Sequence, residues 1–208
     1  MLDRTLREHL DQVAAPAPTA TGGGVGAVTA ASAAGLVTMT ARLCPALDDA
    51  AELVARAEQL RCSLTSLAEE DEHSYEAVLA AQRRDSADPE RPRALREALR
   101  GAARPPLRVA RASAEVAVLA ADLAGRAKRA VRGDAVTACA LAAASARSAA
   151  ALARENLAAA AKLDEPDPRG LEGLAPSLDE EAEVVARTAR RAQDEADALL
   201  DGPVDGAR

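Results

Sequence analysis

Most of the apolar residues in this chain are alanine, and aromatic residues are almost absent. Hydrophobic residues make up 49% of the 208 positions, yet Tyr75 is the only aromatic residue and there is no Phe or Trp. Small side chains favour helices whose backbones approach one another closely. They also bury little apolar area per residue, so a second subunit would supply contacts that a monomer lacks. The composition therefore predicts an all-α protein that forms a homodimer.

The apolar runs and the residues that interrupt them predict an up-and-down bundle of about six long helices. The run that opens at Gly22 carries almost no charge before Arg42, so we expect it to be buried on most sides. Asp48 and Asp134 are suitable N-caps, and residues 177–180 form a capping box. We expect one domain over residues 1–200 and a frayed tail over 201–208. The expected helices cover residues 2–13, 22–43, 48–83, 94–101, 107–129 (kinked or restarted at Pro105 and Pro106), 134–163 and 177–200.

Charge and cysteine content indicate a soluble cytoplasmic protein. The net charge is −7, with acids and bases intermixed, and aromatic residues that could stack on bases are absent but for one. We therefore expect no binding to nucleic acid or to an anionic membrane. The N-terminal residues lack an apolar signal region, and no charge-free run of about eighteen apolar residues predicts a membrane span. Three widely spaced cysteines fit a reducing compartment and a role as small core fillers (Cys44, Cys62 and Cys139).

Asp71 is the candidate catalytic residue, because it lies where an amphipathic helix should carry an apolar side chain. The apolar stripe around it consists of Leu64, Leu67, Tyr75, Val78 and Leu79. A carboxylate on a packed face costs several kcal/mol of desolvation unless it is paired or protonated. Asp71 is therefore expected to face a functional cavity, with a structural partner as the alternative.

Three other features are candidates for binding. Gly22-Gly23-Gly24 at the start of a helix exposes amide N–H groups to a ligand, or it allows two helices to cross closely. Glu70 and His73 have the spacing of half a di-metal motif, but a second copy is missing, so we expect a solvated acidic face and no metal. Asn156 lies among small apolar residues, where its amide is suited to bind either backbone or ligand.

Taken in order, these features resemble the cyclodeaminase/cyclohydrolase family over nearly the whole chain. Residues 6–10 and 16–24 look like the family's N-terminal helix and its Pro-Gly-Gly-Gly-Ser entry. Residues 64–82 are similar to its Leu-x-x-Leu-x-Asp-x-Asp-x-x-Ala-Phe segment, and residues 104–107 to its kinked Val-Pro-Leu turn. Residues 134–137 resemble the Asn-Ala-Val-Ser element, and Asn156 falls on the Asn of an Asn-Val pair.

The resemblance implies a site and a reaction. Asp71 takes the place of the catalytic acid, and the substrate-binding positions are Gly22, Gly23, Gly24, Tyr75, Asp134, Thr137 and Asn156. The implied substrate is a tetrahydrofolate derivative, with no metal. Either 5,10-methenyltetrahydrofolate is hydrolysed to 10-formyltetrahydrofolate, or 5-formiminotetrahydrofolate cyclises and loses ammonia.

The chain also departs from the family pattern at several polar positions. Val25 replaces the serine that follows the glycines, and Ala138 and Ala160 replace an acid and an Asn. A Gly-Lys/Arg-Lys cluster is replaced by residues 46–49 (Ala-Leu-Asp-Asp), which reverses the local charge. Two functions therefore remain open: a folate-dependent enzyme, or a divergent member that binds or assembles, or that acts on another substrate.

Overall fold

The computed structural model describes residues 5–16, 22–163 and 178–201, and these residues form helices without a strand. The bounds are α1 Leu6–Ala14, α2 Gly22–Leu43, α3 Ala50–Gln82, α4 Arg91–Arg126, α5 Arg129–Ala161 and α6 Leu178–Asp201. The all-α prediction is confirmed. The expected extended lead-in at 17–21, the capping residue Ser177 and the tail 202–208 lie outside the described residues.

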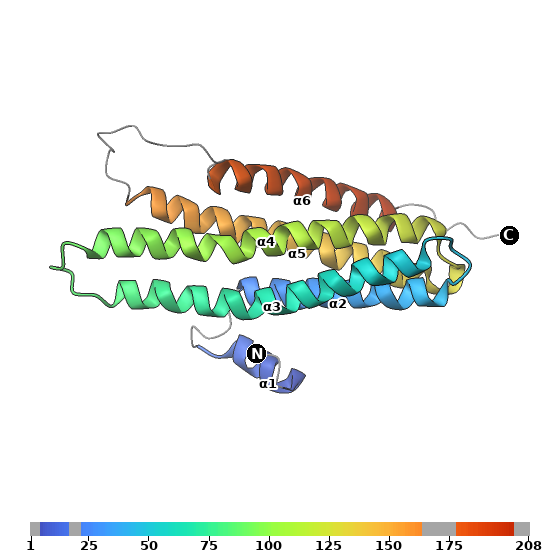
Figure 1. Ribbon diagram of the computed structural model, residues 1–208, viewed down its shortest axis with the longest axis horizontal. Coiled ribbons are helices and arrows are strands. Elements are labelled where there is room, and N and C mark those ends of the chain that lie inside the picture. The colour runs from blue at the N-terminus through green and yellow to red at the C-terminus, as the bar shows by residue number, and fades with distance from the viewer. Residues whose placement is uncertain (1–4, 17–21, 164–177, 202–208) are drawn as a thin grey trace.

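Helices α2 to α5 run up and down side by side, and α6 lies along α4 and α5 (Figure 1). Helix α1 lies outside this bundle, and none of its residues is buried (Figure 1). Its N-terminus is closed by a capping box, in which Thr5 Oγ1 accepts from the Glu8 amide at 3.3 Å while the Thr5 amide donates to Glu8 Oε2 at 2.7 Å. The up-and-down bundle predicted from the sequence is confirmed.

Alanine fills most of the core, as its abundance predicts. The largest fully buried side chains include Leu64, Leu67, Leu107 and Leu123, which project from α3 and α4. Helix α2 is buried on most sides, as expected, because eleven of its 22 residues are buried and six more are half-buried. Its exposed residues include Met39 and Leu43, near its C-terminal end.

By length and composition alone, α2 and α5 are long and apolar enough to cross a membrane. The most apolar windows of these helices are 56% and 50% buried inside the bundle, respectively. Core helices of proteins that do not cross a membrane have the same properties, so this is weak evidence for a span. Residues 22–41 carry no charge, but threonine and serine interrupt them, so they are not a continuous apolar run.

Helices α3, α4 and α5 begin at other residues than the sequence predicts, and α4 begins at Arg91 rather than at residue 94. Helix α5 begins at Arg129, so Gly133 and Asp134 lie inside it and Asp134 is not a cap. Asp48 is not the cap of α3 as predicted, because the helix begins after Asp49, whose side chain makes no capping hydrogen bond. Asp49 instead accepts two hydrogen bonds from Arg126, at 2.9 and 3.0 Å, and Arg126 holds the pKa of this carboxyl below its usual range. This ion pair joins the start of α3 to the end of α4.

Helix α4 continues through Pro105 and Pro106, so of the two expected outcomes, a kink or a restart, the restart is wrong. Proline has no N–H, so the carbonyls of Gly101 and Ala102, four residues earlier, lose their donors within the helix. The side-chain amide of Asn156 on α5 donates to the Ala102 carbonyl at 2.9 Å. Asn156 therefore supplies the hydrogen bond that Pro106 removes, which explains how a double proline persists inside a packed helix.

We predict that Asn156→Ala lowers the free energy of unfolding by about 1–3 kcal/mol, because the Ala102 carbonyl is left without a donor. In a Pro106→Ala background the amide of residue 106 restores the bond within the helix, so the same change costs less. Urea unfolding followed by circular dichroism measures this double-mutant cycle. Glu155→Ala, at the exposed neighbouring position, is the control. An equal cost of Asn156→Ala in both backgrounds would contradict the explanation.

Candidate functional site

The carboxylate of Asp71 lies against the first turn of α2. A Cβ atom added to Gly23 would stand 2.5 Å from both carboxylate oxygens, so the side chain is in close contact with the backbone there. Asp71 is only 6% exposed. The first amides of a helix lack partners within the helix, and the positive end of the helix dipole favours negative charge. The N-terminus of α2 thus offsets the desolvation cost of burying the Asp71 carboxylate.

Within the glycine triplet, Gly23 is the residue that the contact requires. Gly22 is exposed, and a Cβ there would meet Leu152 of α5 at an ordinary 3.5 Å. Gly24 is buried. These contacts support the interpretation that the triplet allows close packing. Binding of a ligand by the glycines stays a prediction.

On α3, three of the five residues of the predicted stripe are buried, namely Leu64, Leu67 and Val78. Leu79 is half-buried, and Tyr75, one turn beyond Asp71, is 36% exposed. Ser74 Oγ donates to the Asp71 carbonyl at 2.9 Å. The site thus presents a buried acid next to an accessible aromatic side chain.

The neighbouring acids do not form a metal site among the described residues, where no group of three or more His, Cys, Asp and Glu side chains is suited to hold an ion. Glu70 pairs with Arg108 of α4, and Glu72 is half-buried rather than fully solvated. The ring of His73 is exposed, and its Nδ1 lies 2.7 Å from the Glu69 carbonyl. This contact is the main reason that the pKa of His73 is raised, and Glu76 and Glu72 add to the shift.

The other predicted site residues lie along α5. Asn156 lies one turn after Leu152, the α5 residue that faces Gly22. The side-chain amide nitrogen of Asn156 donates its hydrogen bond to the Ala102 carbonyl. Asp134 and Thr137 lie eighteen and fifteen residues before Leu152, so they are about 27 and 22 Å away along the helix axis. Thr137 Oγ1 donates to the Gly133 carbonyl at 2.9 Å. Within one chain, the structure does not bring Asp134 and Thr137 to the carboxylate of Asp71.

Two of the three cysteines are buried, as expected of core fillers, but Cys62 is exposed, so that expectation is wrong for Cys62. Burial raises the pKa of the Cys139 thiol to about 11. The thiolate form is therefore disfavoured at neutral pH, which argues against a nucleophilic role for Cys139.

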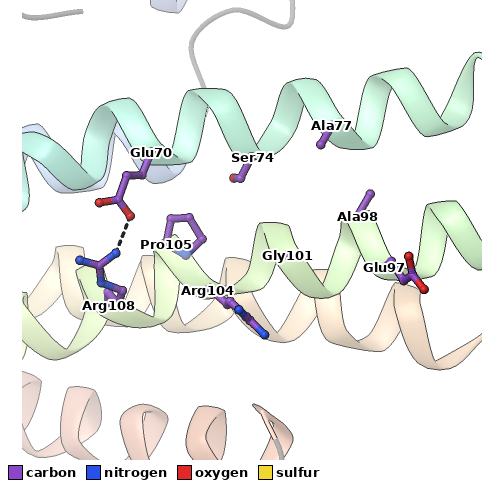
Figure 2. A pocket seen from close by; sticks show the side chains of 9 residues that line it. All are labelled: Glu70, Ser74, Ala77, Glu97, Ala98, Gly101, Arg104, Pro105 and Arg108. Atoms are coloured by element: carbon purple, nitrogen blue, oxygen red, sulfur yellow. Dashed lines mark hydrogen bonds and ion pairs between the residues drawn. The ribbon is translucent and has the colours of Figure 1, made fainter.

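A groove between α3 and α4 adjoins the segment that carries Asp71 (Figure 2). Its volume is about 660 Å³, and its lining residues are Glu70, Ser74, Ala77, Glu97, Ala98, Gly101, Arg104, Pro105 and Arg108. Figure 2 shows Glu70 and Arg108 paired across the groove. Pro105 cannot donate the helical hydrogen bond to the Gly101 carbonyl, and both residues line this groove together with charged side chains. The sequence analysis did not predict this groove. The four-residue spacing of Gly101 and Pro105 does indicate that the Gly101 carbonyl lacks its usual helical donor.

The sequence model of the formiminotransferase-cyclodeaminase family matches residues 5–165 of the chain. The chain belongs to this family. Its fold is similar to a solved formiminotetrahydrofolate cyclodeaminase from Thermotoga maritima, with a TM-score of 0.75 and 24% sequence identity over 97% of this chain and 98% of that one. Comparison with curated protein sequences gives no match. The family resemblance inferred from the sequence is thereby confirmed.

We predict that Gly23→Ala destabilises the protein by about 1–3 kcal/mol, because the added methyl group overlaps the Asp71 carboxylate. The loss should shrink in an Asp71→Ala background, which removes the overlapping atoms. Chemical denaturation of the four proteins gives the coupling energy.

Gly133→Ala is the matched control for the Gly23 substitution, since nothing lies within 4 Å of a Cβ at that position in α5. It should stabilise the protein by about 0.5–1 kcal/mol, as glycine-to-alanine changes do inside helices. If Gly23→Ala behaved like this control, the close contact between Asp71 and α2 would be refuted.

Proposed function

We propose that this protein is a folate-dependent one-carbon enzyme. It either hydrolyses 5,10-methenyltetrahydrofolate to 10-formyltetrahydrofolate, or cyclises 5-formiminotetrahydrofolate with loss of ammonia. Membership of the formiminotransferase-cyclodeaminase family supports a folate substrate. The observation that carries the proposal is the Asp71 carboxylate, which is buried against the first turn of α2.

Both reactions centre on a cationic, amidinium-like carbon. A carboxylate in a site with little water stabilises such a cation more strongly than one in bulk solvent. In hydrolysis, Asp71 takes a proton from the water that attacks this carbon and gives it to N5 as the C–N5 bond breaks, while the remaining hydroxyl proton leaves to solvent as the formyl C=O forms. In cyclisation, N10 attacks the protonated formimino carbon, and Asp71 takes the N10 proton and gives it to the amino group, which leaves as ammonia as its C–N bond breaks. One general acid–base group therefore serves either reaction.

The remaining site residues have different proposed roles. Gly22 and Tyr75 are exposed beside Asp71, so we assign them contacts to the substrate. Asn156 positions α4 against α5, because its amide nitrogen is bonded to Ala102. Asp134 and Thr137 lie too far along α5 to act on a substrate at Asp71 of the same chain. They require the homodimer, in which a second copy would present them. We also propose a cytoplasmic location and catalysis without a metal.

A second function is favoured by the departures from the family pattern. Asp49, in the segment that replaces the family's basic cluster, is paired with Arg126 and so has a structural role. Ala138 and Ala160, which replace polar residues, are buried in apolar surroundings. These substitutions remove polar groups and cations that would hold a folate. The alternative is a divergent member that binds or assembles, or that acts on another substrate.

The two functions predict different outcomes in one spectroscopic assay. The purified protein should accelerate the loss of the methenyltetrahydrofolate chromophore or, with formiminotetrahydrofolate, release ammonia. Asp71→Asn should lower kcat by about 10²–10⁴-fold, because the general acid–base group is lost. Glu76→Ala, an exposed acid near Asp71 on α3, is the control and should leave the rate unchanged.

No acceleration by the wild-type protein with either substrate, even at high enzyme concentration, would refute the enzymatic proposal. Titration with a folate analogue would then distinguish a silent folate binder from a protein without a folate site. Full activity in Asp71→Asn would leave the reaction in place but would refute the role of Asp71.

A further inference from the structure

A second groove lies between α5 and α6, on a different face of α5 from the residues that contact α2. Its volume is about 470 Å³, and its lining residues are Arg147, Ala150, Ala151 and Arg154 of α5 with Ala186, Ala189 and Arg190 of α6. Figure 1 shows α6 lying along this part of α5. The groove thus has an alanine floor and three arginine side chains at its walls.

The three arginines form no ion pair with a carboxylate of the described chain, and all three are exposed. Other arginines in the bundle do form such pairs, as in Arg56 with Glu115 and Arg111 with Glu181. Other exposed arginines, such as Arg187 and Arg191, also form no ion pair with a described carboxylate, so what distinguishes these three is that they line one groove.

The spacing of the arginines allows them to act together. Arg147 and Arg154 are seven residues apart, so they lie on the same face of α5, two turns and about 10.5 Å apart along the axis. Arg190 lines the groove from α6. The alanines between them project little, which leaves the groove open to a ligand that all three side chains can reach.

We propose that this groove binds a small organic polyanion, which is recognised through its phosphate or carboxylate groups. The planar guanidinium group donates paired hydrogen bonds to either kind of anion. A groove of this size accommodates a metabolite rather than a single ion. No aromatic side chain lines it, so the affinity comes from charge and hydrogen bonds and not from stacking on a ring. The site is independent of the proposed folate reaction at Asp71.

Isothermal titration calorimetry of the full-length protein with two probes, tripolyphosphate and citrate, tests this proposal. We expect one probe ion to bind per chain, with an affinity that falls as salt is added. Arg147→Gln and Arg154→Gln should each weaken binding by about tenfold, and the double variant should abolish it. Arg191→Gln removes the same charge from the neighbouring position on α6, outside the groove, and should change the affinity less than twofold. Circular dichroism melts establish that the variants are folded.

The two probes also identify the preferred chemistry. Tighter binding of tripolyphosphate supports a phosphate-bearing ligand, and tighter binding of citrate supports a polycarboxylate. If neither probe binds, or if Arg191→Gln weakens binding as much as Arg154→Gln does, the proposal is overturned. Because no folate is used, these outcomes do not depend on whether the protein is a one-carbon enzyme.

Discussion

The contact between the Asp71 carboxylate and the first turn of α2 is the constraint on which the candidate site depends. Burying this acid is unfavourable unless a group of opposite polarity faces it, and the N-terminus of α2 supplies that polarity. The approach is possible because residue 23 has no side chain. The same contact fixes α2 against α3, so a residue that we assign to catalysis also takes part in packing.

The rest of the bundle follows a similar principle, in which polar contacts fix helices whose apolar side chains are small. Alanine cores bring backbones close together, but such small side chains interdigitate little. Hydrogen bonds and ion pairs between helices therefore help to fix how the helices are placed. Asn156 compensates for Pro106 between α5 and α4, and Arg126 joins the end of α4 to Asp49. Both interactions join helices that are neighbours in the bundle.

Helical periodicity was enough to predict the bundle and the buried position of Asp71, because both depend on local patterns of apolar residues. The partners of polar groups were harder to predict, since they come from distant segments. Pro105 and Pro106 predict a kink or a restart, and the tertiary hydrogen bond from Asn156 to the Ala102 carbonyl explains how α4 continues past Pro106. Gly133 and Asp134 resembled a helix start but lie inside α5. The arginine groove between α5 and α6 depends on how two helices pack, which sequence spacing alone does not reveal.

A crystal structure of the Asp71→Asn variant with a bound, non-hydrolysable analogue of methenyltetrahydrofolate would test the central claim most directly. Our account predicts that the carbon bridging N5 and N10 lies beside the side chain of residue 71, with an attacking or leaving group within about 3 Å of it. The pterin should lie near Gly22 and Tyr75. An analogue bound elsewhere, for instance only in the groove between α3 and α4, would contradict the assignment of Asp71 as the catalytic residue.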